Sequence, residues 1–127
     1  MEKKGFVSLW LGTAGSEEEL EAYVTAPYDE EGDALDSPFM ADFGIEDEDE
    51  DFREIQLLEQ AAQEIAVILS GHSYDDVIIP RFQELSGPVL NEAVNAVILL
   101  YNFAYSGQAG RTASGMTFIG TASYEDK

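Results

Sequence analysis

The sequence contains no cysteine, so it can form no disulfide, offers no thiol nucleophile and holds no thiolate metal site. It has few basic residues, six against 26 acidic ones, which gives a formal net charge of −20 on 127 residues. It also lacks an apolar stretch of the roughly 18 residues that a membrane-spanning helix needs. Residues 1–5 lead into a strand-like segment without a signal-type apolar region, so we expect a cytoplasmic protein.

What the chain has in excess is negative charge. Most of its acidic residues lie between Glu17 and Glu59, and residues 46–51 are an unbroken acidic run. Such a field repels nucleic acid, anionic membranes and phosphorylated metabolites, and it attracts cationic protein surfaces. The stretches 29–33 and 46–51 lack the residue pattern of an EF-hand loop, so we expect no dedicated metal site and no cofactor. The negative charge therefore indicates that this chain binds another protein, one with a basic surface.

The length and a hydrophobic fraction of 45% fit one domain over residues 1–127. Ser16 and Glu19 form a capping box that predicts a helix ending before Pro27. Ser37-Pro38 predicts a second, short helix that ends near Gly44. The other expected elements are strands over 6–11, 52–58, 95–105 and 116–124 and helices over 61–69 and from 74 or 75 to 85. Residues 57–62 are equally compatible with a helix.

This order predicts an α+β fold with a single four-stranded mixed or antiparallel sheet, helices mainly on one face and a C-terminal hairpin of the last two strands. Alternation along the strands gives the sheet two faces. The expected aliphatic face carries Val7, Leu9, Leu11, Ile55, Leu57, Ile98, Leu100 and Ile119. The expected aromatic face carries Phe6, Trp10, Tyr101, Phe103, Tyr105, Phe118 and Tyr124. Two interpretations of the aromatic face stay open: a partly exposed interface, or a second core covered by the loop 27–51.

Two local patterns with a possible chemical function are better explained structurally. Residues 12–16 join a strand to a helix start, where backbone amides can bind phosphate, but the glutamates that follow favour a plain capped turn. His72, the only histidine, has Asp75 and Asp76 nearby in the sequence, yet no nucleophile elbow accompanies it. We therefore expect no enzyme; a closed pocket around His72 with convergent carboxylates would reverse that expectation.

Four segments resemble the immunity protein 22 family: Phe6–Gly12, Phe39–Gly44, Asn95–Tyr101 and Phe118–Thr121. The resemblance runs along the whole chain, and its motifs are structural. It implies a small cytosolic antidote from a bacterial polymorphic toxin system, encoded beside a toxin that it neutralises by direct binding. It supplies no catalytic or cofactor residues.

The resulting hypothesis is an immunity protein that occludes the active cleft of a toxin, which we expect to be a basic, nuclease-type enzyme. The alternative is an acidic nucleic-acid mimic that regulates a host DNA- or RNA-binding protein. Acids of the two acidic stretches are expected to steer the partner: Asp29, Glu31, Asp47, Asp49 and Asp51. Trp10 and Tyr105 are the expected aromatic anchors. We expect a monomer or weak homodimer that binds neither nucleic acid nor membrane.

Overall fold

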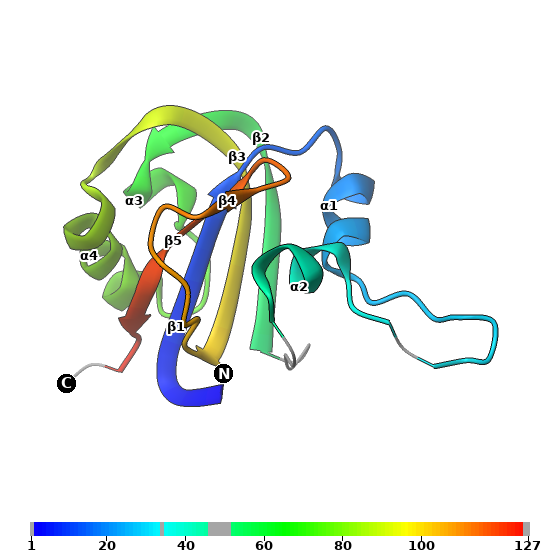
Figure 1. Ribbon diagram of the computed structural model, residues 1–127. Coiled ribbons are helices and arrows are strands. Elements are labelled where there is room, and N and C mark those ends of the chain that lie inside the picture. Colours follow the sequence, from blue (N-terminus) through cyan, green and yellow to red (C-terminus); the bar gives the residue numbers. More distant parts are fainter. Residues whose placement is uncertain (1, 34, 46–51, 126–127) are drawn as a thin grey trace.

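The N-terminal strand lies at the centre of a five-stranded sheet in the computed structural model, which describes residues 2–33, 35–45 and 52–125 (Figure 1). The strands are β1 (Glu2–Gly12), β2 (Arg53–Glu64), β3 (Val89–Phe103), β4 (Thr112–Ala113) and β5 (Met116–Ser123). Their order across the sheet is β2-β3-β1-β5-β4, and each of these neighbouring pairs is antiparallel. The α+β class is confirmed, but the prediction of four strands was wrong.

The predicted hairpin between the last two long strands was also wrong, because β1 lies between them. Leu9 pairs with Leu99 of β3 on one side and with Gly120 of β5 on the other. Consecutive strands often pair with each other, which is why the sequence favoured a hairpin. The C-terminal hairpin that does form is smaller, and it joins Ala113 of β4 to Met116 of β5.

Strand β2 extends well beyond the predicted boundary at residue 58. Ala62 pairs with Val94 and Glu64 pairs with Val89, so residues that we expected to begin a helix belong to the sheet. The helix predicted over 61–69 is reduced to α3 (Ile65–Ile68). Alanine and leucine favour helices, but backbone pairing with a long neighbouring strand outweighs that weak preference.

Helices cover both faces of the sheet, whereas the prediction placed them mainly on one face. The helices α1 (Glu17–Val24) and α2 (Pro38–Phe43) lie on one side, and α3 and α4 (Asp75–Ser86) lie on the other (Figure 1). The predicted starts of α1 and α2 are confirmed. The Ser16 hydroxyl accepts from the Glu19 amide at 3.2 Å, and the Ser37 hydroxyl accepts from the Met40 amide at 3.1 Å. Gly44 ends α2 with a left-handed φ of 68°, as glycine readily does.

Each face of the sheet has its own core. The aliphatic core lies under α3 and α4 and consists mainly of Val7, Leu9, Leu11, Ile65, Ile68, Leu69, Ile78, Phe82, Val97 and Leu99. The aromatic core lies under α1 and α2 and contains Trp10, Leu20, Val24, Phe39, Phe43, Ile45, Ile98, Leu100, Phe103, Met116 and Phe118. The interpretation of the aromatic face as a second core is therefore confirmed, since Phe39 and Phe43 come from within the segment 27–51.

Several residues lie on the face opposite to the predicted one. Trp10 pairs with Ile98 across β1 and β3, and Ile98 pairs with Ile55 across β3 and β2, so these three side chains share one face. Ile98 and Ile55 therefore belong to the aromatic core, together with Leu57 and Leu100, while Tyr101 and Tyr124 pack with the aliphatic core. Side chains alternate with a period of two, so a register error of one residue exchanges the faces.

Candidate partner-binding surface

The outer face of α1 is acidic. Glu17, Glu18, Glu19 and Glu21 are exposed, whereas the apolar side of the helix is buried against the aromatic core. Glutamates in a first turn are stabilised by the positive end of the helix dipole. The residues of the last turn, 21–24, include no basic one. The positive charge at the negative end of the helix dipole comes from Arg53 of β2 instead, whose Nη1 donates to the Val24 carbonyl at 3.1 Å.

The projecting loop, residues 27–33 and 35–36, extends away from the sheet between α1 and α2 (Figure 1). Its backbone closes on itself, because Leu35 N donates to Pro27 O at 2.7 Å and Asp29 N donates to Asp33 O at 2.9 Å. The Asp29 Oδ1 atom accepts from the amides of Glu31 and Asp33, each at 2.9 Å. Asp29 therefore shapes the turn, while the Glu31 side chain is exposed.

The projecting loop also carries apolar side chains at the surface. Tyr28 is 73% exposed and Leu35 is 48% exposed. Large apolar side chains beside charged ones are a frequent composition of protein interfaces. Only the charge of this loop entered the sequence-based prediction, and Tyr28 was not among the predicted anchors. The tyrosine's position in an acidic, turn-forming segment is the sequence signal that could have identified it.

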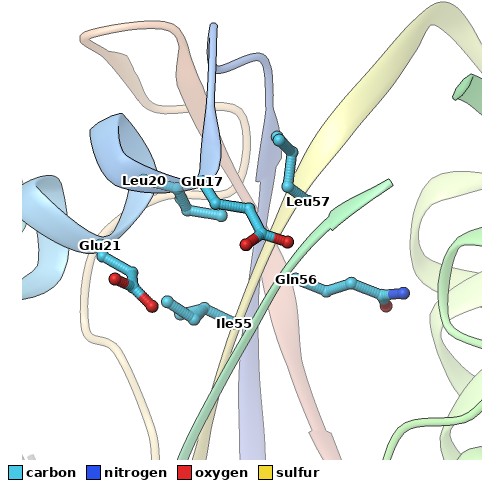
Figure 2. A pocket seen from close by; sticks show the side chains of 6 residues that line it. All are labelled: Glu17, Leu20, Glu21, Ile55, Gln56 and Leu57. Carbon is cyan, nitrogen blue, oxygen red and sulfur yellow. The ribbon is translucent and has the colours of Figure 1, made fainter. Parts of the chain in front are cut away.

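An open pocket separates α1 from β2 (Figure 2). Its volume is about 290 Å³, and it is lined by Glu17, Leu20, Glu21, Ile55, Gln56 and Leu57. Figure 2 shows the side chains of Glu17 and Glu21 extending from the helix toward the strand, one helical turn apart. The pocket thus combines apolar walls with two carboxylates. The i, i+4 spacing of the two glutamates is visible in the sequence, but the strand opposite them is not.

Neither predicted aromatic anchor is a free surface side chain. Trp10 has no exposed surface, and its ring packs at 4.9 Å from Phe39 and 5.1 Å from Phe118, centroid to centroid. The prediction that Trp10 contacts a partner is therefore corrected: Trp10 is a core residue. Tyr105 is half-buried, and its hydroxyl donates to the Phe43 carbonyl at the end of α2. Both outcomes follow from the placement of α2 over the aromatic face.

The predicted steering residues divide between two segments. Asp29 and Glu31 lie in the projecting loop, whose other acids are Glu30, Asp33 and Asp36, all exposed. Asp47, Asp49 and Asp51 lie outside the residues that the structure describes, so their prediction stays a prediction.

His72 is part of a tether between β2 and the segment that precedes α4. Its Nδ1 atom lies 3.0 Å from the Glu54 carboxylate, which also accepts from the Ser73 amide at 3.1 Å and from the Ser73 hydroxyl. Burial raises the pKa of Glu54, but the hydrogen bonds from Ser73 and His72 outweigh it and lower that pKa below its usual value. The His72 Nε2 atom is buried and contacts no hydrogen-bonding group of the described residues, so no described nucleophile faces it.

Two further arginines bind backbone carbonyls at the ends of elements. Arg81 Nη1 donates to the carbonyls of Ser123 and Glu125, at 2.7 and 2.8 Å. Arg111 Nη2 donates to the Asp42 carbonyl in the last turn of α2 at 3.0 Å. These cations attach one part of the fold to another, which leaves the carboxylates of α1 and of the projecting loop to set the charge of their surface.

Within residues 2–33, 35–45 and 52–125, no group of three or more histidine, aspartate or glutamate side chains is arranged to hold a metal ion. No helix in those ranges is both long enough and apolar enough to cross a membrane.

Comparison with known protein families matches residues 7–125 to the family described as immunity protein 22. Comparisons with curated proteins and with solved structures gave no significant match. The matched region contains β1 from Val7 onward, β2 through β5, both cores, the projecting loop and the α1–β2 pocket. Because this match covers nearly the whole chain, the protein belongs to the immunity protein 22 family.

Proposed function

We propose that this protein acts in the cytoplasm to neutralise a cognate bacterial toxin by binding over the active cleft of a basic, nuclease-type enzyme. Membership in an immunity-protein family supports the toxin-neutralising role. The observation that carries the choice of target is the acidic surface formed by α1 and the projecting loop. A nuclease cleft is positively charged where it binds the phosphate backbone, and an acidic surface complements it.

The projecting loop is the element best suited to enter such a cleft. It extends beyond the body of the fold, and its internal hydrogen bonds hold its shape before the partner arrives. A loop that is already ordered loses less conformational entropy on binding. Glu31 and the other exposed acids of the loop steer the toxin, together with Asp47, Asp49 and Asp51 of the acidic run.

Steering and anchoring fall to different side chains. Exposed charges raise the association rate, but each contributes little to the final affinity. Tyr28 replaces Trp10 as the proposed anchor, because its ring is exposed and lies beside the acids. The exposed part of Tyr105 remains a proposed contact. The α1–β2 pocket takes a lysine or arginine side chain of the toxin, whose aliphatic stem packs on Leu20 and Ile55 while its charged head meets the carboxylates of Glu17 and Glu21.

The test measures association of the purified chain with the product of the neighbouring toxin gene over a range of salt concentrations. We expect the association rate to fall steeply as the ionic strength rises. The double substitution Glu30→Gln/Glu31→Gln should slow association about three- to tenfold at low salt. The matched control Glu84→Gln/Glu92→Gln removes the same charge at exposed positions on α4 and β3, and it should have a smaller effect.

An association rate that does not change with salt would contradict electrostatic steering. An equal effect of the two double substitutions would show that net charge matters and the projecting loop does not. If the neighbouring gene product is not bound at all, while a host nucleic-acid-binding protein is, the nucleic-acid-mimic alternative replaces the immunity role.

A further inference from the structure

Tyr74 adopts a backbone conformation that is unfavourable for its residue type. It directly precedes α4 and has φ 61° and ψ 29°, in the left-handed region. A bulky residue at positive φ is a genuine outlier, and such outliers collect at functional sites. The Tyr74 side chain is 54% exposed, and as the N-cap of α4 it makes no capping hydrogen bond. Neither full burial nor helix capping therefore accounts for a tyrosine at this position.

The surrounding structure holds Tyr74 in this conformation. The residue before it is fixed by two strands: the Ser73 amide and hydroxyl donate to the Glu54 carboxylate of β2, and the Ser73 carbonyl accepts from the Tyr101 hydroxyl of β3 at 2.5 Å. His72 adds a further contact to the same carboxylate. The direction of the Tyr74 side chain is thus set by hydrogen bonds from the sheet.

The ring of Tyr74 completes a cluster of three tyrosines in mutual ring contact, which we name the tyrosine patch: Tyr74, Tyr101 and Tyr124. The centroids of Tyr74 and Tyr124 lie 4.7 Å apart, and those of Tyr101 and Tyr124 lie 5.4 Å apart. Tyr101 is buried at the base with 7% exposure, Tyr124 is half-buried, and Tyr74 forms the exposed top. The hydroxyl of Tyr124 donates to Asn102 at 2.5 Å. A rigid aromatic group supported from below is the typical composition of an interface hot spot.

Carboxylates lie near the base of the tyrosine patch. Glu54 accepts from the Ser73 amide, and the carbonyl of the same serine accepts from the Tyr101 hydroxyl. Asp75 directly follows Tyr74, and its Oδ2 accepts from the Gly71 amide at 2.9 Å. In keeping with these positions, burial raises the pKa of Tyr101 and the charges of Glu54 and Asp75 raise it further. Asp76, the next residue of α4, is exposed. Arg81, the nearest cation on α4, is directed at the backbone carbonyls of Ser123 and Glu125. Aromatic faces bordered by carboxylates suit a guanidinium group, which stacks on a ring while it pairs with an acid.

We propose that the tyrosine patch is a second contact surface of this chain and that its occupant is an arginine-bearing segment of the cognate toxin. This inference rests on the proposed function and extends it to the α4 side of the sheet, opposite the helix α1. A second copy of the chain is a poor occupant, because it would bring two strongly negative surfaces together.

The first experiment tests the patch without the toxin. Isotope-labelled protein is titrated with Nα-acetyl-arginine amide and, separately, with Nα-acetyl-citrulline amide, which has a similar shape but no charge. We expect saturable shifts of the backbone amides of residues 73–76 and of Tyr124 with the arginine probe alone. Tyr74→Asn should abolish these shifts, and Tyr28→Asn, which removes an exposed tyrosine elsewhere, should keep them. Equal shifts with both probes, or shifts confined to α1 and the projecting loop, would overturn the proposal.

The second experiment separates a binding role of Tyr74 from a structural one. Asparagine tolerates positive φ far better than tyrosine, so Tyr74→Asn should keep or raise the melting temperature. The same variant should dissociate from the neighbouring toxin at least tenfold faster. A lower melting temperature with an unchanged dissociation rate would mean that Tyr74 is only structural. A concentration-dependent dimer of the wild type that Tyr74→Asn abolishes would make a second copy the occupant and overturn the proposal.

The two proposals fail in different ways. If the chain binds the toxin and Tyr74→Asn dissociates at the wild-type rate, this inference fails while the immunity role stands. If no toxin binding is found although the arginine probe shifts residues 73–76, the immunity role fails and the patch remains a cation-binding surface.

Discussion

The two faces of the sheet differ in how their helices are attached. On the aliphatic side the attachment depends on a carboxylate, because Glu54 accepts hydrogen bonds from His72 and Ser73 just before α4. On the aromatic side it depends on donors that act on carbonyls at the end of α2, namely the Tyr105 hydroxyl and the Arg111 guanidinium. Arg81 of α4 also donates to the Ser123 carbonyl of β5, so the aliphatic side combines both kinds of attachment. The carboxylate of Glu54 is what distinguishes it from the attachments made by Tyr105 and Arg111.

Because of this difference, we expect acid pH to weaken the attachment of the helices more on one side of the sheet than on the other. Arginine and tyrosine keep their protons from acid to neutral pH, so the attachments of α2 do not change in that range. Glu54 accepts hydrogen bonds more strongly when it is ionised, so acid weakens its attachment of the aliphatic side. The attachment through Glu54 is therefore acid-sensitive, whereas the attachments of α2 through Tyr105 and Arg111 are not.

The largest expected effect tests whether the two cores unfold together. Trp10→Ala removes the ring at the centre of the aromatic core and should lower the free energy of unfolding by about 3–5 kcal/mol. Phe82→Ala is the matched change in the aliphatic core and should cost a similar amount. Urea unfolding followed by far-ultraviolet circular dichroism measures both. A second transition in either variant, or a loss below about 1 kcal/mol for Trp10→Ala, would mean that one layer detaches independently.

The second-largest expected effect tests whether Glu54 makes the stability of the aliphatic side depend on pH. Glu54→Gln should cost about 1 kcal/mol at neutral pH, because hydrogen bonds to a charged acceptor are the stronger kind. The pKa of Glu54 is lowered by folding, so its contribution is present above the unfolded pKa of about 4.3 and is lost as the pH falls through the lower folded pKa. The difference in unfolding free energy between wild type and Glu54→Gln should therefore shrink below about pH 4.3. A difference that stays constant to pH 3 would remove Glu54 as the acid-sensitive group.

A similar or smaller effect is expected from the corresponding attachment on the aromatic side. Tyr105→Phe leaves the Phe43 carbonyl without its donor and should cost about 1 kcal/mol, with no change between neutral pH and pH 4. Tyr28→Phe removes a hydroxyl from a side chain that is 73% exposed and should leave stability unchanged. Thermal unfolding at both pH values measures the pair. A pH-dependent loss in Tyr105→Phe would erase the distinction between the two layers.

The smallest effect concerns the acidic surface above the aromatic core. Self-repulsion among the carboxylates destabilises the compact state at low ionic strength. Raising the salt to a physiological concentration should raise the melting temperature by about 3 °C or less. Glu30→Gln/Glu31→Gln should reproduce part of this rise at low salt, and Glu84→Gln/Glu92→Gln serves as the matched control on the α4 side. Identical melting curves at all salt concentrations would show that the acids are fully solvated.

Local signals in the sequence predicted the elements that local interactions decide. Ser16 with Glu19, and Ser37-Pro38 with Gly44, place α1 and α2 correctly because caps depend on residues within one turn. Such local signals could not predict the long-range pairing of β2 with β3. Residues 59–64 have ordinary helix-forming side chains and become a strand only because β3 lies beside them. The insertion of β1 between β3 and β5 was missed for the same reason.

The candidate partner-binding surface, too, could be predicted only where local sequence signals decide the outcome. The acids of α1 and of the projecting loop could be identified from composition, since charged side chains stay at the surface wherever the helix packs. The aromatic anchors could not, because the exposure of Trp10 depends on where α2 lies. The conformation of Tyr74 gives no sequence signal at all. Its positive φ results from contacts with β2 and β3, which are remote in sequence.

The central position of β1 has a consequence for how soon the protein can act in a cell. The ribosome makes β1 before both of its neighbours in the sheet, β3 and β5. A nascent chain therefore has a strand with two open edges until β3 leaves the exit tunnel and one open edge until residues near 123 follow, so the sheet cannot close around β1 before β5 is made. A cell that relies on this protein for immunity has to translate β5 before the toxin becomes active.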